Sequence, residues 1–356
     1  MMDIKAVQEF IKGISDKQLN TPVLIVGDTG IGKSYQLKDL AKAQGEGFGF
    51  IDLRLATQEV TDLIGIPRTV QEGEGEFTTY WTRPNWWPKE GTRGILALEE
   101  VNRAPEDVRQ AIFQLLTEWR LHTHVLPKGW SIVALINPDN NQYHVNQLDP
   151  AFKRRFIQIV MNAPHEIDWG IWAKKNEVHD DVIRFVSQFP KLLSIYEDIS
   201  IDARPTPAGY HMLSTLLTAK AIPKQCLMEV ATGIIGKEAA ISFLQSLSRG
   251  FEKPITAKEI FEDYGKVKKR HADLLSEKRN DLLYVTMVDV IASCEVDEIK
   301  VDKKALDNFH EYLKDCKAET LTTIILRLNE KILNKLCKFD DLVAKVNSIK
   351  KEISEV

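Results

Sequence analysis

Cysteine is scarce in this sequence, and its few copies are scattered. The four cysteines among 356 residues show none of the short spacings of zinc sites or redox pairs. No stretch is long and apolar enough to cross a membrane, and residues 1–10 lack the apolar core of a signal peptide. These absences argue against a disulfide-stapled secreted domain and a membrane protein, so we expect a cytoplasmic protein with no membrane contact.

The sequence also lacks a strong charge of one sign. Its 47 basic and 51 acidic residues give a formal net charge of −4, which does not favour nucleic acid or an anionic membrane as a partner. The basic run Lys266–Arg270 has mixed-charge surroundings without interleaved aromatic residues, which is typical of a solvated helix or loop. With 44% hydrophobic residues, the chain can bury a core and form two or three domains.

Apolar runs and helical periodicities alternate through the first half of the chain. We expect five strands, at residues 23–26, 49–53, 95–98, 132–136 and 156–160. Helices are expected around them, at residues 4–11, 35–43 and 105–119. Continuous apolar strands separated by helices predict a parallel sheet covered on both faces. After about residue 168 the strand signals fade, and the remaining pattern is helical.

Directly after the first expected strand comes the run Gly27-Asp28-Thr29-Gly30-Ile31-Gly32-Lys33-Ser34. It matches the phosphate-binding loop pattern, in which glycines let backbone N–H groups point at phosphates. The lysine of such a loop reaches the β- and γ-phosphates, the serine can ligate Mg²⁺, and the helix that follows adds its dipole. We therefore predict that all eight residues of this loop bind a nucleoside triphosphate.

A second signal is the apolar strand that ends in Glu99 and Glu100. A phosphoanhydride hydrolase needs one carboxylate to hold hydrated Mg²⁺ and another to polarise the attacking water. By position, we assign Glu99 to the metal and Glu100 to the water. The alternative is an acidic turn that caps a strand, which the loop upstream disfavours.

Polar residues also border the fourth and fifth expected strands. Asn137 follows the fourth strand, where it can orient water or sense the γ-phosphate, although an Asn-Pro pair also simply stops a strand. Arg154 and Arg155 precede the fifth strand. A permanently charged, planar guanidinium suits charge that develops in phosphoryl transfer, while the alternative is a pair of solvated helix-end cations.

Two further features have open or structural interpretations. Residues 69–81 have β-prone flanks around an acidic, glycine-punctuated turn, which predicts a hairpin that either contacts a partner or is a plain surface element. Its acidic tip argues against a grip on DNA. His122 and His124 are expected on one face of a strand, but they have no third ligand nearby, so we interpret them as structural.

In this order, the motifs resemble those of AAA+ ATPases, and of the MoxR-like branch in particular, over roughly residues 1–250. The resemblance rests on the segments Asp62–Pro67, Trp81–Pro88, Glu100–Pro105, Val125–Trp130, Asn137-Pro138, Arg155-Phe156 and Gly233–Ala240. It implies an α/β fold: an AAA+ P-loop domain with a five-stranded parallel sheet over residues 1–165, including a hairpin insert near 60–90. An all-α lid over 166–250 and a helical C-terminal extension over 251–356 would follow.

The resemblance further implies a homo-oligomeric ring, commonly a hexamer, that hydrolyses ATP with Mg²⁺ and remodels or matures a protein complex in a chaperone-like way. In such a ring Asn137 would be the first sensor. Arg155 would be the arginine finger on the neighbouring site, with Arg154 the lesser candidate. Members of this branch often work with a von Willebrand A-type partner. The choice of ATP over GTP also rests on the resemblance.

Two residues depart from the family pattern. Glu99 stands where the family usually has aspartate, and Ala208 stands where a second-sensor arginine is expected, with Arg204 as a nearby substitute. These departures support a second hypothesis, a nucleotide-gated scaffold with negligible hydrolysis. A third hypothesis is a DNA-processing or clamp-handling motor, which the net charge does not favour.

Overall fold

A computed structural model describes residues 4–138, 146–195, 203–248, 253–295, 302–328 and 330–336. These residues fall into two compact units. The N-terminal unit ends at Pro164, and the C-terminal unit begins at His165. None of the helices within the described ranges is long and apolar enough to span a membrane.

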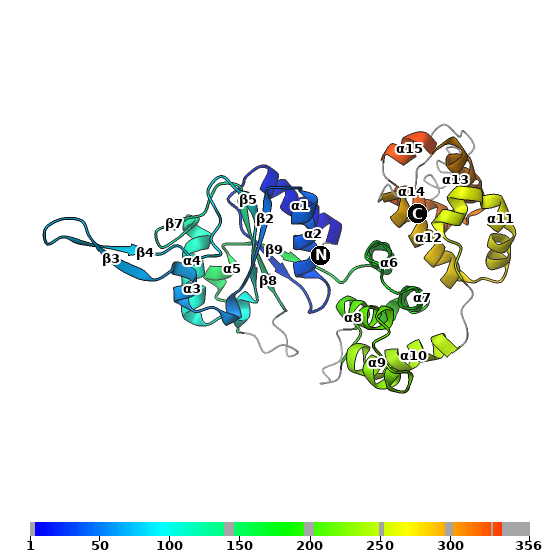
Figure 1. Ribbon diagram of the computed structural model, residues 1–356, viewed down its shortest axis with the longest axis horizontal. Coiled ribbons are helices and arrows are strands. Elements are labelled where there is room, and N and C mark those ends of the chain that lie inside the picture. The colour runs from blue at the N-terminus through cyan, green and yellow to red at the C-terminus, as the bar shows by residue number, and fades with distance from the viewer. Residues whose placement is uncertain are drawn as a thin grey trace. The chain divides into compact units, whose positions relative to one another are not determined.

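The N-terminal unit is built on a five-stranded sheet in the order β2-β5-β8-β1-β9, in which all neighbours are parallel (Figure 1). Its strands are β1 (Val23–Val26), β2 (Phe48–Arg54), β5 (Arg93–Glu99), β8 (Trp130–Ile136) and β9 (Ile157–Val160). The predicted α/β fold with a five-stranded parallel sheet is therefore confirmed.

The two faces of this sheet carry different helices (Figure 1). Alternate strand residues point to opposite faces, so Leu24 and Leu96 join one buried cluster and Ile25 and Ile95 join another. The first cluster contains the apolar stripe of α4 (Glu106–Glu118) and the side chain of Leu63 in α3 (Val60–Ile64). The second contains the stripes of α1 (Ile4–Asp16) and α2 (Lys33–Ala43). Each fully buried Leu or Ile side chain contributes about 1.5–3 kcal/mol.

An antiparallel hairpin of β3 (Pro67–Gln71) and β4 (Phe77–Trp81) lies between β2 and β5 in sequence and extends away from the sheet (Figure 1). Its turn is acidic and exposed, with Glu72, Glu74 and Glu76. At its base, the Trp81 ring lies 4.3 Å from the His122 ring.

The strand expected to carry both histidines is instead a second small hairpin. Strands β6 (Arg120–Leu121) and β7 (His124–Val125) pair antiparallel, and His122 lies in the turn with a φ of 51°. The prediction that His122 and His124 share one strand face is therefore wrong, because a left-handed residue reverses the chain between them. Each packs on a different tryptophan, Trp81 for His122 and Trp87 for His124.

Among the described residues after Pro164, the regular elements are all helical. They include the 3₁₀ turns η3 (Pro190–Leu192) and η4 (Lys224–Cys226) and ten α-helices: α6 (Glu166–Lys175), α7 (Asp180–Gln188), α8 (Pro207–Thr218), α9 (Leu227–Ile235), α10 (Lys237–Ser248), α11 (Ala257–Ser276), α12 (Asn280–Glu295), α13 (Lys303–Asp315), α14 (Ala318–Arg327) and α15 (Glu330–Leu336).

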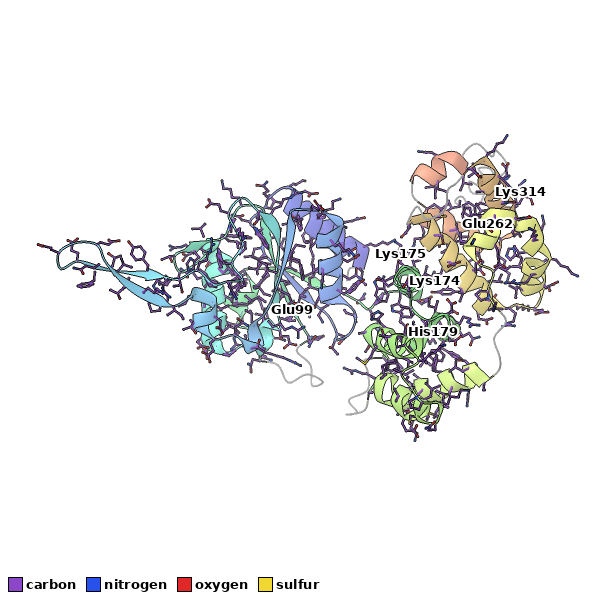
Figure 2. The ribbon with its side chains drawn as sticks, viewed as in Figure 1. Glu99, Lys174, Lys175, His179, Glu262 and Lys314 are labelled. Atoms are coloured by element: carbon purple, nitrogen blue, oxygen red, sulfur yellow. The ribbon has the colours of Figure 1, made fainter. Side chains whose placement is uncertain are left out.

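Helix α6 ties the first helices of this unit to the later ones. Its Ile171 belongs to the cluster formed by α11–α15, while Val285 of α12 belongs to the cluster formed by α7–α10. Ion pairs reinforce the contact, from Lys174 to Asp289 at 3.7 Å and from Lys175 to Glu295; Figure 2 labels both lysines on α6. The division of these helices near residue 250 into lid and extension stays a prediction.

Candidate functional site

Three of the predicted site segments meet at one edge of the sheet. The loop 27–34 follows β1, Glu99 ends β5, and Asn137 follows β8. Strands β5, β8 and β1 are neighbours and run parallel, so their carboxyl ends lie side by side. In open α/β sheets, ligands bind at this edge.

The backbone of the loop has the shape that its glycines allow. Gly32 caps α2 with a φ of 97°, a left-handed conformation that side chains rarely adopt. A Cβ atom on Gly27 would lie 2.7 Å from the Ile31 side chain and 2.9 Å from the Met161 carbonyl oxygen. Helix α2 begins at Lys33, earlier than the sequence predicts, so its first N–H groups and its dipole are presented at the loop.

Lys33 is held by three oxygen atoms at the end of the loop. Its ammonium group donates to the carbonyl oxygens of Gly27 at 2.6 Å and Asp28 at 2.8 Å, and to Asn137 Oδ1 at 3.0 Å. Burial lowers the pKa of Lys33 to about 8, although the charges of Glu99, Asp28 and Glu100 oppose the shift. An ammonium group whose partners are neutral oxygens can exchange them for phosphate oxygens, which are anionic and form stronger hydrogen bonds.

Glu99, which Figure 2 labels, is 8% exposed, and its carboxylate oxygen Oε1 has no hydrogen-bond partner. Burial raises the pKa of Glu99, and the hydrogen bond from Ser34 and the charge of Lys33 act in the opposite direction. Asp52 and Arg54, on the neighbouring strand β2, also act on this carboxylate. A buried Oε1 without a partner, beside a serine hydroxyl, fits a hard divalent cation. Ser34 and Glu99 are therefore the residues that would hold Mg²⁺.

Glu100 has a strained backbone and an accessible carboxylate. Its φ of 55° and ψ of 38° are left-handed, which costs a non-glycine residue roughly 1–2 kcal/mol. Its N–H donates to the Leu135 carbonyl at 3.0 Å, which fixes it against β8. Its side chain is 40% exposed and lies 3.8 Å from the Arg103 guanidinium. Such backbone strain clusters at functional sites.

Asn102 belongs to this site, although the sequence marks only the tract around it. It is 2% exposed, and its Nδ2 donates to the backbone carbonyl of Asn137 at 3.0 Å. The signal in the sequence that could have found Asn102 is its place as a polar residue two positions after the acidic pair Glu99-Glu100. Its partner could not be read from the sequence because it lies 35 residues away, just after the end of β8.

Arg154 and Arg155 lie at the amino-terminal ends of the strands, opposite to the carboxyl ends where Lys33 and Glu99 lie. They precede β9, whose first residue Ile157 donates to the carbonyl of Pro22, just before β1. A four-residue strand separates the two edges by about 13 Å. Both arginines are exposed, and the Arg155 guanidinium lies 5.2 Å from the centroid of the Phe113 ring on α4. The structure therefore does not bring them to Lys33 and Glu99 of the same chain.

The expected second-sensor position lies in the C-terminal unit. Pro207 begins α8, and the Thr206 hydroxyl caps this helix by accepting from the Gly209 N–H at 3.0 Å. Ala208 follows in the first turn with only a methyl side chain. Arg204 as its substitute stays a prediction.

The fold and this edge define a nucleotide-binding α/β domain of the P-loop class. Residues 22–156 match the family model described as the AAA domain of the dynein-related subfamily. The coarser part of the sequence-based interpretation, an AAA domain with a five-stranded parallel sheet, is therefore confirmed.

Solved structures with similarity to this chain include three bacterial proteins. A candidate ATPase from Cytophaga hutchinsonii is 16% identical over 69% of this chain and 89% of that one, with a TM-score of 0.31. A point variant of RuvB from Thermotoga maritima is 11% identical over 74% and 76%, with a TM-score of 0.35. NtrX from Brucella abortus, solved with ADP, is 12% identical over 87% and 68%, with a TM-score of 0.39.

Proposed function

We propose that this chain is an ATP-hydrolysing AAA+ ring ATPase of the MoxR-like type that remodels or matures a protein complex. The observation that supports this most is the group formed by Lys33, Ser34 and Glu99 at the carboxyl edge of the sheet. It combines an anion site with a buried carboxylate oxygen that has no partner.

The residues of this edge divide the chemistry among them. ATP with Mg²⁺ supplies the phosphoanhydride bond that is hydrolysed. The loop 27–34 binds its phosphates through backbone N–H groups, and Lys33 exchanges its present oxygen partners for phosphate oxygens. Ser34 and Glu99 hold the metal. Glu100 accepts the proton of the attacking water, and Asn137 orients that water.

The place of Arg155 supports a site completed by a second subunit. An exposed arginine at the amino edge of the sheet serves no site at the carboxyl edge of its own chain. In a ring, the same side chain of a neighbouring subunit can approach the γ-phosphate, and an arginine in that role is worth about 10³–10⁵-fold in rate. Ring assembly, the hexameric number and a von Willebrand A-type partner remain proposals from the resemblance.

One observation favours the nucleotide-gated scaffold as a second candidate. The Glu100 carboxylate lies 3.8 Å from the Arg103 guanidinium, and a base held in this ion pair must leave it before it can activate water. In this alternative the chain binds ATP and assembles, but it turns ATP over negligibly.

The experiment that separates these functions is ATP hydrolysis per subunit over a range of protein concentrations. For the ring ATPase, the rate per subunit rises with concentration and falls about 10²–10⁴-fold in Glu100→Gln, which binds ATP but lacks the base. Mixing Arg155→Ala with Glu100→Gln subunits restores part of the rate, because one of the two kinds of mixed boundary joins an intact Glu100 to an intact Arg155. A rate at background at every concentration, with ATP bound, contradicts hydrolysis and supports the scaffold.

A further inference from the structure

Asn102 is a buried polar side chain in the turn that carries the proposed base. It lies in the 3₁₀ turn η2 (Val101–Arg103), which begins directly after Glu100. The side chain is 2% exposed. Burying an amide without hydrogen bonds is unfavourable, so the partners of this amide indicate what the position is for.

Its side-chain donor joins two strands. Nδ2 donates to the Asn137 carbonyl oxygen at 3.0 Å, just beyond the end of β8. One residue before η2, the Glu100 N–H donates to the Leu135 carbonyl at 3.0 Å. The turn after β5 is thus tied to β8 at two points, one beside the proposed base and one at the proposed sensor.

The Asn137 side chain faces Lys33 while its backbone is held by Asn102. Its Oδ1 accepts from the Lys33 ammonium at 3.0 Å. When Lys33 turns to a phosphate, this side-chain bond is given up, and the bond from Asn102 is left to fix the Asn137 backbone. With the backbone fixed, only the two side-chain torsions of Asn137 can change. The amide therefore stays near the place where Lys33 binds the phosphate.

We propose that Asn102 is a positioning residue that holds the Asn137 amide in place against the γ-phosphate. It also keeps the Asn137 amide at a fixed position relative to Glu100. This inference rests on the proposed nucleotide site and goes beyond it by naming the residue that couples sensor and base. Asn102 acts through Asn137 and touches no substrate. Its loss therefore weakens recognition of the γ-phosphate more than it weakens nucleotide binding.

The test is the ratio of the ADP to the ATP dissociation constant, measured by calorimetry with Mg²⁺ in a Glu100→Gln background, where ATP is not consumed. Asn137→Ala should lower this ratio about 10- to 100-fold, because a hydrogen bond to a charged phosphate oxygen is lost. Asn102→Leu should lower it about 3- to 10-fold with ADP affinity within about 3-fold of the parent. The double variant should be no lower than Asn137→Ala alone, because the two residues act in series.

Two controls separate positioning from folding. Asn102→Asp keeps the volume but replaces the donor with an acceptor, so it should repeat the Leu result even if Asn102→Leu folds poorly. Ser131→Ala changes another buried polar residue, at the far end of β8, and should leave the ratio unchanged.

A ratio that stays at the parent value in Asn102→Asp, or effects of Asn102 and Asn137 that add fully, overturns the inference. This readout needs no hydrolysis. Failure of the proposed ATPase activity is seen in the wild type as a background rate, and the binding ratio then still measures the role of Asn102 independently.

Discussion

One polar group in each of the two compact units can be compared by how its hydrogen bonds are satisfied. At the sheet edge of the N-terminal unit, Glu99 has a buried oxygen without a partner, and Lys33 is held by neutral oxygens. In the C-terminal unit, the Tyr264 hydroxyl donates to Asp315 at 2.9 Å and lies 2.7 Å from His271 Nδ1. The first group has hydrogen-bonding capacity left for a ligand, and the second closes on itself.

The difference follows from the architecture of each unit. Parallel strands deliver polar residues from several places in the sequence to one edge, which is where open α/β sheets bind ligands. Tyr264 and His271 instead lie seven residues apart on one face of α11, against Asp315 of α13. Lys268 completes that cluster with an ion pair to Asp315 at 3.2 Å. We infer that the group of Lys33 and Glu99 at the strand ends serves binding, whereas the cluster of Tyr264, His271 and Asp315 between α11 and α13 serves packing.

The largest expected effect is on the lysine of the loop. Lys33→Met keeps the approximate length of the side chain but removes the charge that phosphate oxygens would meet. We expect the dissociation constant for ATP with Mg²⁺ to rise about 100-fold or more, measured by calorimetry, because charge-assisted hydrogen bonds are lost. Lys38→Met, on the exposed side of the same helix, is the matched control and should leave the affinity unchanged. Equal losses in both variants would contradict a specific role for Lys33.

A second change should separate binding from stability at the same edge. Glu99→Gln removes a carboxylate whose pKa is raised by burial, so the ionised form destabilises the folded protein without metal. We expect Mg²⁺-dependent ATP affinity to fall about 10-fold or more. The free energy of unfolding without ligand should rise in urea titrations at pH 7, because the ionised carboxylate is no longer buried. A loss of stability in the absence of metal would show that Glu99 is a structural residue.

For the cluster of Tyr264, His271 and Asp315 we expect the opposite result, a loss of stability without a change in ATP affinity. Tyr264→Phe removes the hydroxyl that joins Asp315 and His271 and leaves both without this partner. We expect a loss of about 1–3 kcal/mol in the protection of α11 and α13 amides from hydrogen exchange, with ATP affinity unchanged. Tyr80→Phe, on the exposed hairpin, is the control with no expected effect. A change in ATP affinity for Tyr264→Phe would break the comparison.

The smallest expected effect is a pH dependence. Burial lowers the pKa of His271, although Asp315 opposes the shift, so the folded protein binds this proton less well than the unfolded chain. The contribution of His271 to stability is therefore complete above about pH 6.5 and falls as the pH drops through the lowered pKa. A pKa difference of one corresponds to about 1.4 kcal/mol.

Urea unfolding of wild type and His271→Asn between pH 5 and 8 measures this contribution. The asparagine amide can replace the ring Nδ1 as a donor to Tyr264 but does not titrate. We expect the slope of unfolding free energy against pH below 6.5 to be smaller in the variant. Identical slopes would assign the pH dependence to other titratable groups.

The sequence predicts the N-terminal unit well because its signals are local. Strands β1, β5 and β8 contain continuous apolar runs, and a parallel sheet brings whatever follows those runs to one edge, so Lys33, Glu99 and Asn137 could be placed together in advance. Asn102 could not, because its role depends on a carbonyl group that is 35 residues away.

The helical unit shows the limit of this reasoning. Phe309 and Leu313 are four residues apart, which is a helical spacing, and both are fully buried. The polar cluster beside it was not visible, since Tyr264 and Asp315 are 51 residues apart and meet only when α11 packs on α13. Periodicity shows which face of a helix is buried, but it does not show which helix covers that face.

The most direct test of the contrast is amide hydrogen exchange of the Glu100→Gln variant with and without ATP and Mg²⁺. We predict that residues 27–34 and the turn 99–103 gain protection with ligand, while amides around Tyr264, His271 and Asp315 do not change. Unchanged exchange in residues 27–34 at saturating ATP, or an equal gain in the helical cluster, would contradict the assignment of the sheet edge as the nucleotide site.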